Sequence, residues 1–79
     1  MKQNEENIFR KRFGEVIRRY RKDKQLSQED LADLADLHRT YISELERGLK
    51  TVSMLSLFRI SKALRISASI LIKEVEDSC

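Results

Sequence analysis

The chain contains no proline, and its only glycines are Gly14 and Gly48. These two residue types interrupt helices most strongly, whereas leucine, isoleucine, arginine, lysine and glutamate, which are frequent here, favour them. We therefore predict an all-α protein with short connections between its helices. The 79 residues suffice for one domain, and because a core of that size gives little net stability, assembly with a partner subunit would help.

Apolar residues from Ile8 onward recur at three- and four-residue spacing, which predicts an amphipathic helix over residues 8–23. Its apolar positions are Ile8, Phe9, Phe13, Val16, Ile17 and Tyr20. Residues 1–7 contain no apolar residue except Met1. We expect them to form a disordered leader ahead of one domain over residues 8–76.

Two short helices are predicted next. Ser27 with Asp30 three residues later resembles a capping box, which starts a helix at Gln28. The buried side of this helix is expected to comprise Leu31, Ala32, Leu34 and Ala35. After a short turn, the apolar spacing predicts a helix over residues 39–47, ended by Gly48 in a left-handed conformation.

Ser53 and Ser67 are expected to cap a fourth and a fifth helix. These helices carry more apolar residues than one inward stripe can hold, and such a surplus usually marks an interface. We predict a dimer interface, with some of its members alternatively in the core. The predicted interface residues are Leu55, Phe58, Ile70, Ile72 and Val75.

The second and third helices are each about two turns long and are joined by a turn of three or four residues, which makes them cross steeply. This arrangement is a helix-turn-helix, whose second helix can enter the major groove of DNA. Because Ile42 and Leu45 must face inward, the exposed side offers hydrogen-bonding groups to DNA. These groups belong to Arg39, Thr40 and Ser43.

Two sequence runs, LSQEDLA at residues 26–32 and YISELERG at residues 41–48, resemble the Cro/phage-repressor (Xre-type) helix-turn-helix family. The similarity extends over about residues 10–72 and, within the family, is strongest to controller proteins of bacterial restriction-modification systems. It implies a five-helix, lambda-repressor-like DNA-binding domain. It also implies a homodimer on palindromic operators of its own gene and of the endonuclease gene, activating at one site and repressing when a second is filled. A contact with RNA polymerase is left open.

Three side chains are predicted to contact bases. The guanidinium of Arg39 can donate to guanine O6 and N7 together, which is worth about 1–3 kcal/mol of discrimination. Thr40 and Ser43 can reach a base or a phosphate through their hydroxyls, although a purely structural hydroxyl is almost as good an interpretation.

Five further residues are predicted to contact the DNA backbone. Gln28 begins a helix, where unpaired N–H groups attract a phosphate, and Tyr41 is expected to pack its ring on the domain while its hydroxyl meets the DNA. For His38 and Ser53 the alternative is a helix cap. The full set is Gln28, His38, Tyr41, Lys50 and Ser53.

The resemblance also implies that Glu46 pairs with an arginine of the first helix, and the helical register places Arg21 opposite it. Such a pair would be structural. The family usually has glycine in the turn of the motif because φ is positive there. Asp36 stands at this place, and aspartate tolerates positive φ better than most residues.

No catalysis, metal or cofactor is expected. His38 and Cys79 are the only residues of their kinds, so neither a nucleophile-base pair nor a four-ligand metal site is evident, and no glycine-rich phosphate loop occurs. No run approaches the roughly 18 apolar residues of a membrane span. The polar N-terminus is unlike a signal sequence, so we expect a cytoplasmic protein.

Two alternatives remain at this stage. A phage or plasmid repressor, or the antitoxin of a toxin pair, would have the same fold and only repress. An adaptor that binds another protein without DNA would explain the basic residues of the first helix as solvated surface.

Overall fold

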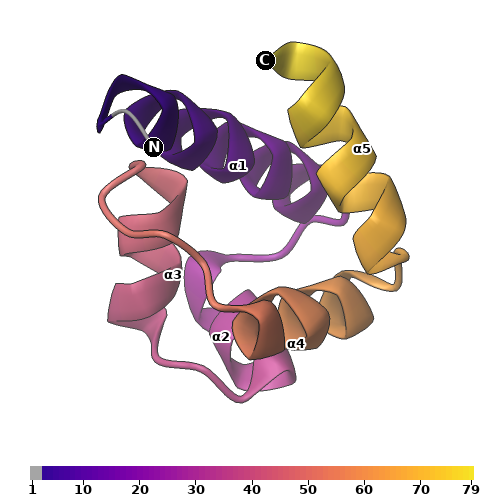
Figure 1. Ribbon diagram of the computed structural model, residues 1–79. Helices are drawn as coiled ribbons and strands as arrows, with labels where there is room; N and C mark the ends of the chain where they lie inside the picture. Colours follow the sequence, from indigo (N-terminus) through magenta and orange to yellow (C-terminus); the bar gives the residue numbers. More distant parts are fainter. Residues whose placement is uncertain (1–2) are drawn as a thin grey trace.

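The computed structural model describes residues 3–79, and these residues form five helices and no strand (Figure 1). The helices are α1 (Gln3–Asp23), α2 (Gln28–Ala35), α3 (Arg39–Glu46), α4 (Met54–Leu64) and α5 (Ala68–Ser78). The predicted all-α, five-helix class is confirmed. None of the helices in this part of the chain combines the length and the apolar character needed to cross a membrane.

Helix α1 begins at Gln3, before the start predicted at Ile8. Of the expected leader, residues 1 and 2 lie outside the described part of the chain, whereas residues 3–7 belong to the helix. Glu5 and Glu6 lie in the first turn, where the positive end of the helix dipole favours carboxylates. The helix therefore extends into a polar segment that carries no apolar stripe.

The predicted capping box at the start of α2 is confirmed. The Ser27 hydroxyl accepts from the Asp30 N–H and the Asp30 carboxylate accepts from the Ser27 N–H, both at 2.9 Å. The hydrogen bond from the Ser27 backbone N–H is the main reason that the pKa of the Asp30 carboxyl lies below its ordinary value. Ser53 and Ser67 cap α4 and α5 through their hydroxyls, whereas His38, at the start of α3, makes no side-chain cap bond.

One core lies between the five helices. Helix α1 packs against α3 and α5, α2 packs against α3 and α4, and α4 packs against α5. Figure 1 shows α1 in the upper part of the molecule, with α3 below it on the left and α5 running up the right-hand side to the C-terminus at the top. The buried apolar residues are Phe13, Val16, Ile17, Leu31, Ala32, Ala35, Ile42, Leu45, Leu57, Ile60, Leu64, Leu71 and Val75.

Two expectations about burial were wrong. Leu34, predicted to face the core, is 61% exposed, because Leu31 and Ala35 set the inward face of α2 and Leu34 lies beside it. Val75, predicted to lie in the dimer interface, is only 2% exposed. It follows Leu71 by one helical turn, and this pair forms the inward stripe of α5.

A polar contact fastens α5 to the end of α1. The Tyr20 hydroxyl and the Arg19 guanidinium both donate to the Glu74 carboxylate. The hydrogen bond from Tyr20 is the main reason that the pKa of Glu74 lies below its ordinary value, and the same bond raises the pKa of Tyr20.

Candidate nucleic-acid interface

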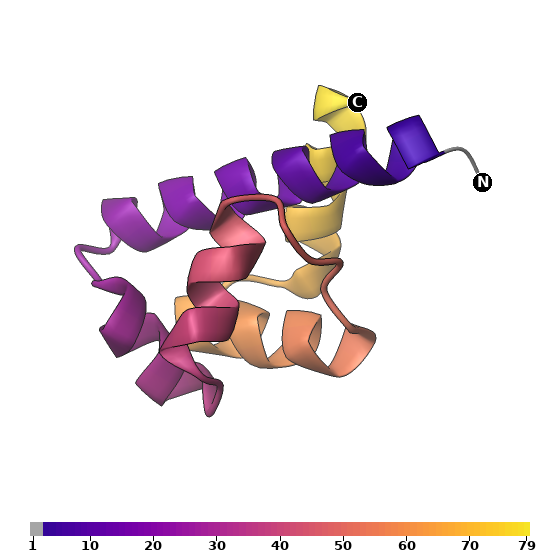
Figure 2. The same cartoon turned by 90° about the vertical axis from the view of Figure 1, so that its left-hand side faces the viewer.

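The turn between α2 and α3 has the conformation expected of a helix-turn-helix. Asp36 ends α2 with φ 57° and ψ 47°, the left-handed region predicted for this position. The Leu37 N–H donates to the Ala32 carbonyl at 2.9 Å, which closes the helix end. Figure 2 shows the result: α3 meets α1 at its C-terminal end and points its N-terminal end toward the far edge of the molecule.

Gly14 allows α1 to cross the last turn of α3 at close range. A Cβ atom at this position would lie 2.4 Å from the carbonyl oxygen of Leu45 and 2.6 Å from that of Glu46. Just beyond the helix, Gly48 has φ 73°, as predicted, and lies beside the backbone of Lys11. The C-terminal end of α3 therefore lies directly against the backbone of α1, and at Gly14 this contact leaves no room for a side chain.

The structure brings Arg21 and Glu46 together in a buried pair. Arg21 Nε donates to Glu46 Oε2 at 2.6 Å and Nη2 donates to Oε1 at 3.0 Å, while Nη1 donates to the Leu26 carbonyl at 2.7 Å. The side chains are 9% and 3% exposed. The bond to Glu46 is the main reason that the pKa of Arg21 is raised. Such a pair fixes the angle between α1 and α3.

Gln28 belongs to the same network. Its amide nitrogen donates to Glu46 Oε1 at 3.1 Å, so the nitrogen points toward α3. That nitrogen carries a second N–H, so the predicted phosphate contact of Gln28 can use this remaining donor or the backbone N–H groups at the start of α2. The amide oxygen is an acceptor and does not suit an anion.

The outward face of α3 is defined by its two fully buried residues, Ile42 and Leu45. Arg39 and Thr40 are exposed and Ser43 is half-buried, so these three remain accessible. At about 100° per residue, however, the positions most nearly opposite the core are Thr40 and Arg47, the residue that follows α3, and Ser43 and Glu44 flank them on either side. Sequence reasoning missed Glu44 and Arg47, although counting four and seven residues on from Thr40 would have found them.

Three side-chain contacts tie the connection between α3 and α4 to the rest of the protein. Lys50 Nζ lies 3.5 Å from Glu44 Oε1. Arg10 Nε donates to the Thr51 hydroxyl at 2.7 Å, and the Ser53 N–H donates to the Tyr41 hydroxyl oxygen at 3.4 Å. Because Tyr41 acts as an acceptor here, its own hydroxyl hydrogen is not used in this bond. The Ser53 hydroxyl accepts from the Ser56 N–H and so caps α4.

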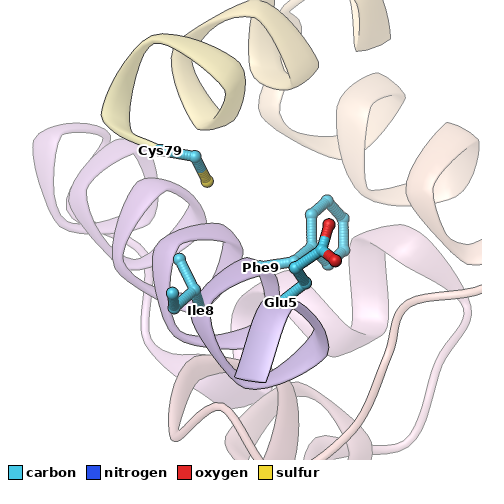
Figure 3. A pocket seen from close by; sticks show the side chains of 4 residues that line it. All are labelled: Glu5, Ile8, Phe9 and Cys79. Carbon is cyan, nitrogen blue, oxygen red and sulfur yellow. The ribbon is translucent and has the colours of Figure 1, made fainter. Parts of the chain in front are cut away.

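Two hollows on the surface of the described residues involve His38 and Cys79. One, of about 350 Å³, adjoins the turn and is lined by Asp36, Leu37, His38 and Tyr41. The other, of about 360 Å³, lies between the start of α1 and the end of α5 (Figure 3), where Cys79 faces Ile8 and Phe9. His38 and Cys79 thus line different hollows. Within residues 3–79 no His, Cys, Asp and Glu side chains gather in a group suited to a metal ion.

Four of the five predicted interface residues are accessible to some degree. Leu55, Phe58 and Ile70 are exposed, Ile72 is half-buried against the core, and Val75 is buried, as noted above. Met54, which the sequence analysis did not select, is 84% exposed at the start of α4. Together with Leu55 and Phe58 it forms an apolar surface on α4.

Comparison with known protein families agrees with this geometry. The family described as Helix-turn-helix matches residues 17–71. The chain is 49% identical over 61 residues to the control protein C.BamHI of Bacillus amyloliquefaciens. The aligned region covers 76% of this chain and 75% of that protein.

Solved structures give the same picture. The restriction-modification controller protein C.AhdI from Aeromonas hydrophila superposes with a TM-score of 0.77 at 39% identity, over 78% of this chain and 94% of that one. The controller protein C.Esp1396I, crystallised as a tetramer in complex with its natural 35-base-pair operator, superposes with a TM-score of 0.74 at 38% identity. That match covers 85% of this chain and 93% of the other.

Proposed function

The chain belongs to the Xre-type helix-turn-helix family, and from this premise we propose that it is a restriction-modification controller that binds operator DNA as a homodimer. The observation that carries the proposal is the presentation of α3. Its C-terminal end is fixed to α1 by the Arg21–Glu46 pair, and its outward face carries Arg39 and Thr40, both exposed. This arrangement suits insertion of the helix into a major groove.

In this proposal Arg39 reads a guanine, and Thr40 and Ser43 contact neighbouring bases. Three groups are proposed to contact the DNA backbone. Tyr41 can donate its hydroxyl hydrogen to a phosphate, and the positive end of α2 at Gln28 attracts another. His38, beside the turn, is the third. Ser53 acts first as the cap of α4, since its hydroxyl already accepts from Ser56. The role proposed for Lys50 is developed below.

Dimerisation is proposed to use the apolar surface of α4 and the start of α5. Leu55, Phe58 and Ile70 are exposed, and isolated proteins seldom leave such large apolar side chains together in water. Figure 1 places α5 on the side of the molecule opposite α3. A two-fold axis near α4 and α5 would present two copies of α3 about 34 Å apart, one turn of DNA, so the operator should be an inverted repeat.

The proposal extends to control of two genes, the protein's own and that of the endonuclease. A tetramer on one operator, as described for C.Esp1396I, is what two adjacent dimer sites would give. We propose that filling the first site activates transcription and that filling the second represses it. As a regulator of bacterial genes the protein would act in the cytoplasm, with residues 8–76 serving as one DNA-binding and dimerisation domain.

Selection of duplexes from a random pool tests the proposal. The wild-type protein should enrich an inverted repeat. In the motif selected by Arg39→Ala, the preference for guanine at one position of each half-site should fall about tenfold or more. Lys73→Ala, which removes an exposed positive charge from α5, should enrich the wild-type motif.

Salt dependence separates this function from that of an adaptor. Neutralised phosphates make the logarithm of the binding constant fall steeply with the logarithm of salt concentration. An adaptor would bind no duplex even at low ionic strength, and that result would overturn the proposal. If the motif selected by the wild-type protein lacked two-fold symmetry, the proposal that the protein binds DNA as a dimer would be overturned.

A further inference from the structure

Glu44 occupies an unexpected place for an acidic residue. It follows Thr40 by one helical turn and, like Ser43 on the other flank, lies beside the side of α3 that faces away from the fully buried Ile42 and Leu45. If α3 enters a major groove, this carboxylate faces bases between two rows of phosphates. An isolated negative charge would be repelled there, so either Glu44 weakens binding or a neighbouring group offsets its charge.

Lys50 is the group that offsets it. Its Nζ lies 3.5 Å from Glu44 Oε1, and the carboxylate side chain is 26% exposed while the lysine is 54% exposed. Lys50 belongs to a connection that is tied down on its C-terminal side: Thr51 is held by Arg10, and the Ser53 N–H is held by Tyr41. The backbone beside Lys50 is thus held near α3, and the ion pair brings the ammonium to Glu44.

We propose that Glu44 determines specificity by accepting a hydrogen bond from the exocyclic amino group of a cytosine, with Lys50 as its counter-ion. The inference rests on the proposed function and names a further base-reading residue for it. In this arrangement Lys50 is a positioning residue for Glu44 and not an independent phosphate contact.

The choice of cytosine follows from hydrogen-bond chemistry. An ionised carboxylate only accepts hydrogen bonds. In the major groove the N4 amino group of cytosine is a donor, whereas guanine O6 and N7 and thymine O4 are acceptors that would repel Glu44. Adenine offers its N6 amino group but places the N7 acceptor beside it. Cytosine is therefore the base that an oxygen acceptor at this position favours.

Substitution of Glu44 by glutamine tests the reading role. Glu44→Gln keeps the shape of the side chain but adds a donor, so cytosine preference at one position of each half-site should fall about tenfold, and adenine should gain. Glu76→Gln, the same change on the exposed end of α5, should enrich the wild-type motif. A motif unchanged by Glu44→Gln would overturn the inference while leaving the proposed function intact, whereas no motif for the wild type would overturn both.

A double-mutant cycle tests the counter-ion. Lys50→Met should weaken binding to the selected duplex about tenfold more when residue 44 is glutamate than when it is glutamine. Only the glutamate protein is left with a carboxylate that has lost its counter-ion. Equal losses in the two backgrounds would show that Lys50 contacts phosphate by itself, and would overturn its role as the counter-ion. Thermal unfolding of each variant checks that the fold is retained.

Discussion

The two ends of α3 differ in how they are held. The anchored end, from Leu45 to Gly48, meets the backbone of α1 at Gly14 and carries the buried bond from Glu46 to Arg21. The free end, from His38 to Thr40, is exposed and has no side-chain cap. The protein therefore fixes the direction of the helix at one end and leaves the residues proposed to read DNA at the other.

This division separates stability from recognition. Substitutions at the anchored end should unfold the protein or tilt α3, and so affect binding to all duplexes alike. Substitutions at the free end should leave unfolding nearly unchanged, because exposed side chains with few contacts contribute little to stability. Three substitutions, at the anchored end and in the turn, test this division.

Glu46→Ala should have the largest effect. It leaves Arg21 buried, with its partner removed, and should lower the free energy of unfolding by about 3–5 kcal/mol, as found when one member of a buried pair is lost. Denaturant unfolding measures this change. The double variant Arg21→Met/Glu46→Leu should recover much of the loss, since no uncompensated charge remains. If Glu46→Ala lowered the free energy of unfolding no more than a substitution on the exposed surface does, the Arg21–Glu46 pair would not hold the anchored end.

Much of the fold was predictable from local signals. The capping box of Ser27 and Asp30, the positive φ of Gly48 and the helical order all follow from residues a few positions apart, whereas the positive φ of Asp36 was implied by the family resemblance. The polar start of α1 was not predictable in this way, because no apolar stripe marks it. Leu34 and Val75 were misplaced because each short helix has apolar residues on two sides, and only packing against other helices selects the buried one.

Gly14→Ala should have the second largest effect. The added methyl group meets the backbone oxygens of Leu45 and Glu46 at less than 3 Å, and backbone atoms cannot move aside as a flexible side chain can. Overpacking of this kind typically costs about 1–3 kcal/mol, even though alanine is the better helix former. Thermal unfolding measures the loss, and Arg18→Ala, on the exposed side of α1, provides the control. A rise in stability would show that α1 does not cross α3 at this contact.

The candidate site was less predictable than the fold. The pairing of Arg21 with Glu46 came from the family resemblance, and the engagement of Gln28 with the same carboxylate was not foreseen because it depends on how three helices meet. Glu44 was passed over because an acidic residue did not suit a surface chosen for its affinity to phosphates. Its compensation by Lys50 requires the path of the connection after α3, which no spacing in the sequence reveals. The base and backbone contacts themselves stay predictions.

Asp36→Gly should have the smallest effect, and its sign is the informative part. At φ 57° an L-residue is strained by up to about 1–2 kcal/mol, aspartate less than most, while glycine adds entropy to the unfolded chain. We expect a net gain of about 0.5 kcal/mol, or a rise in melting temperature of about 2–4 °C. Arg65→Gly, at φ 56° after α4, should gain more, because arginine tolerates this region less well than aspartate does. A fall for Asp36→Gly alone would mean that the aspartate side chain itself holds the turn, and that the free end of α3 is more firmly fixed than its exposed residues suggest.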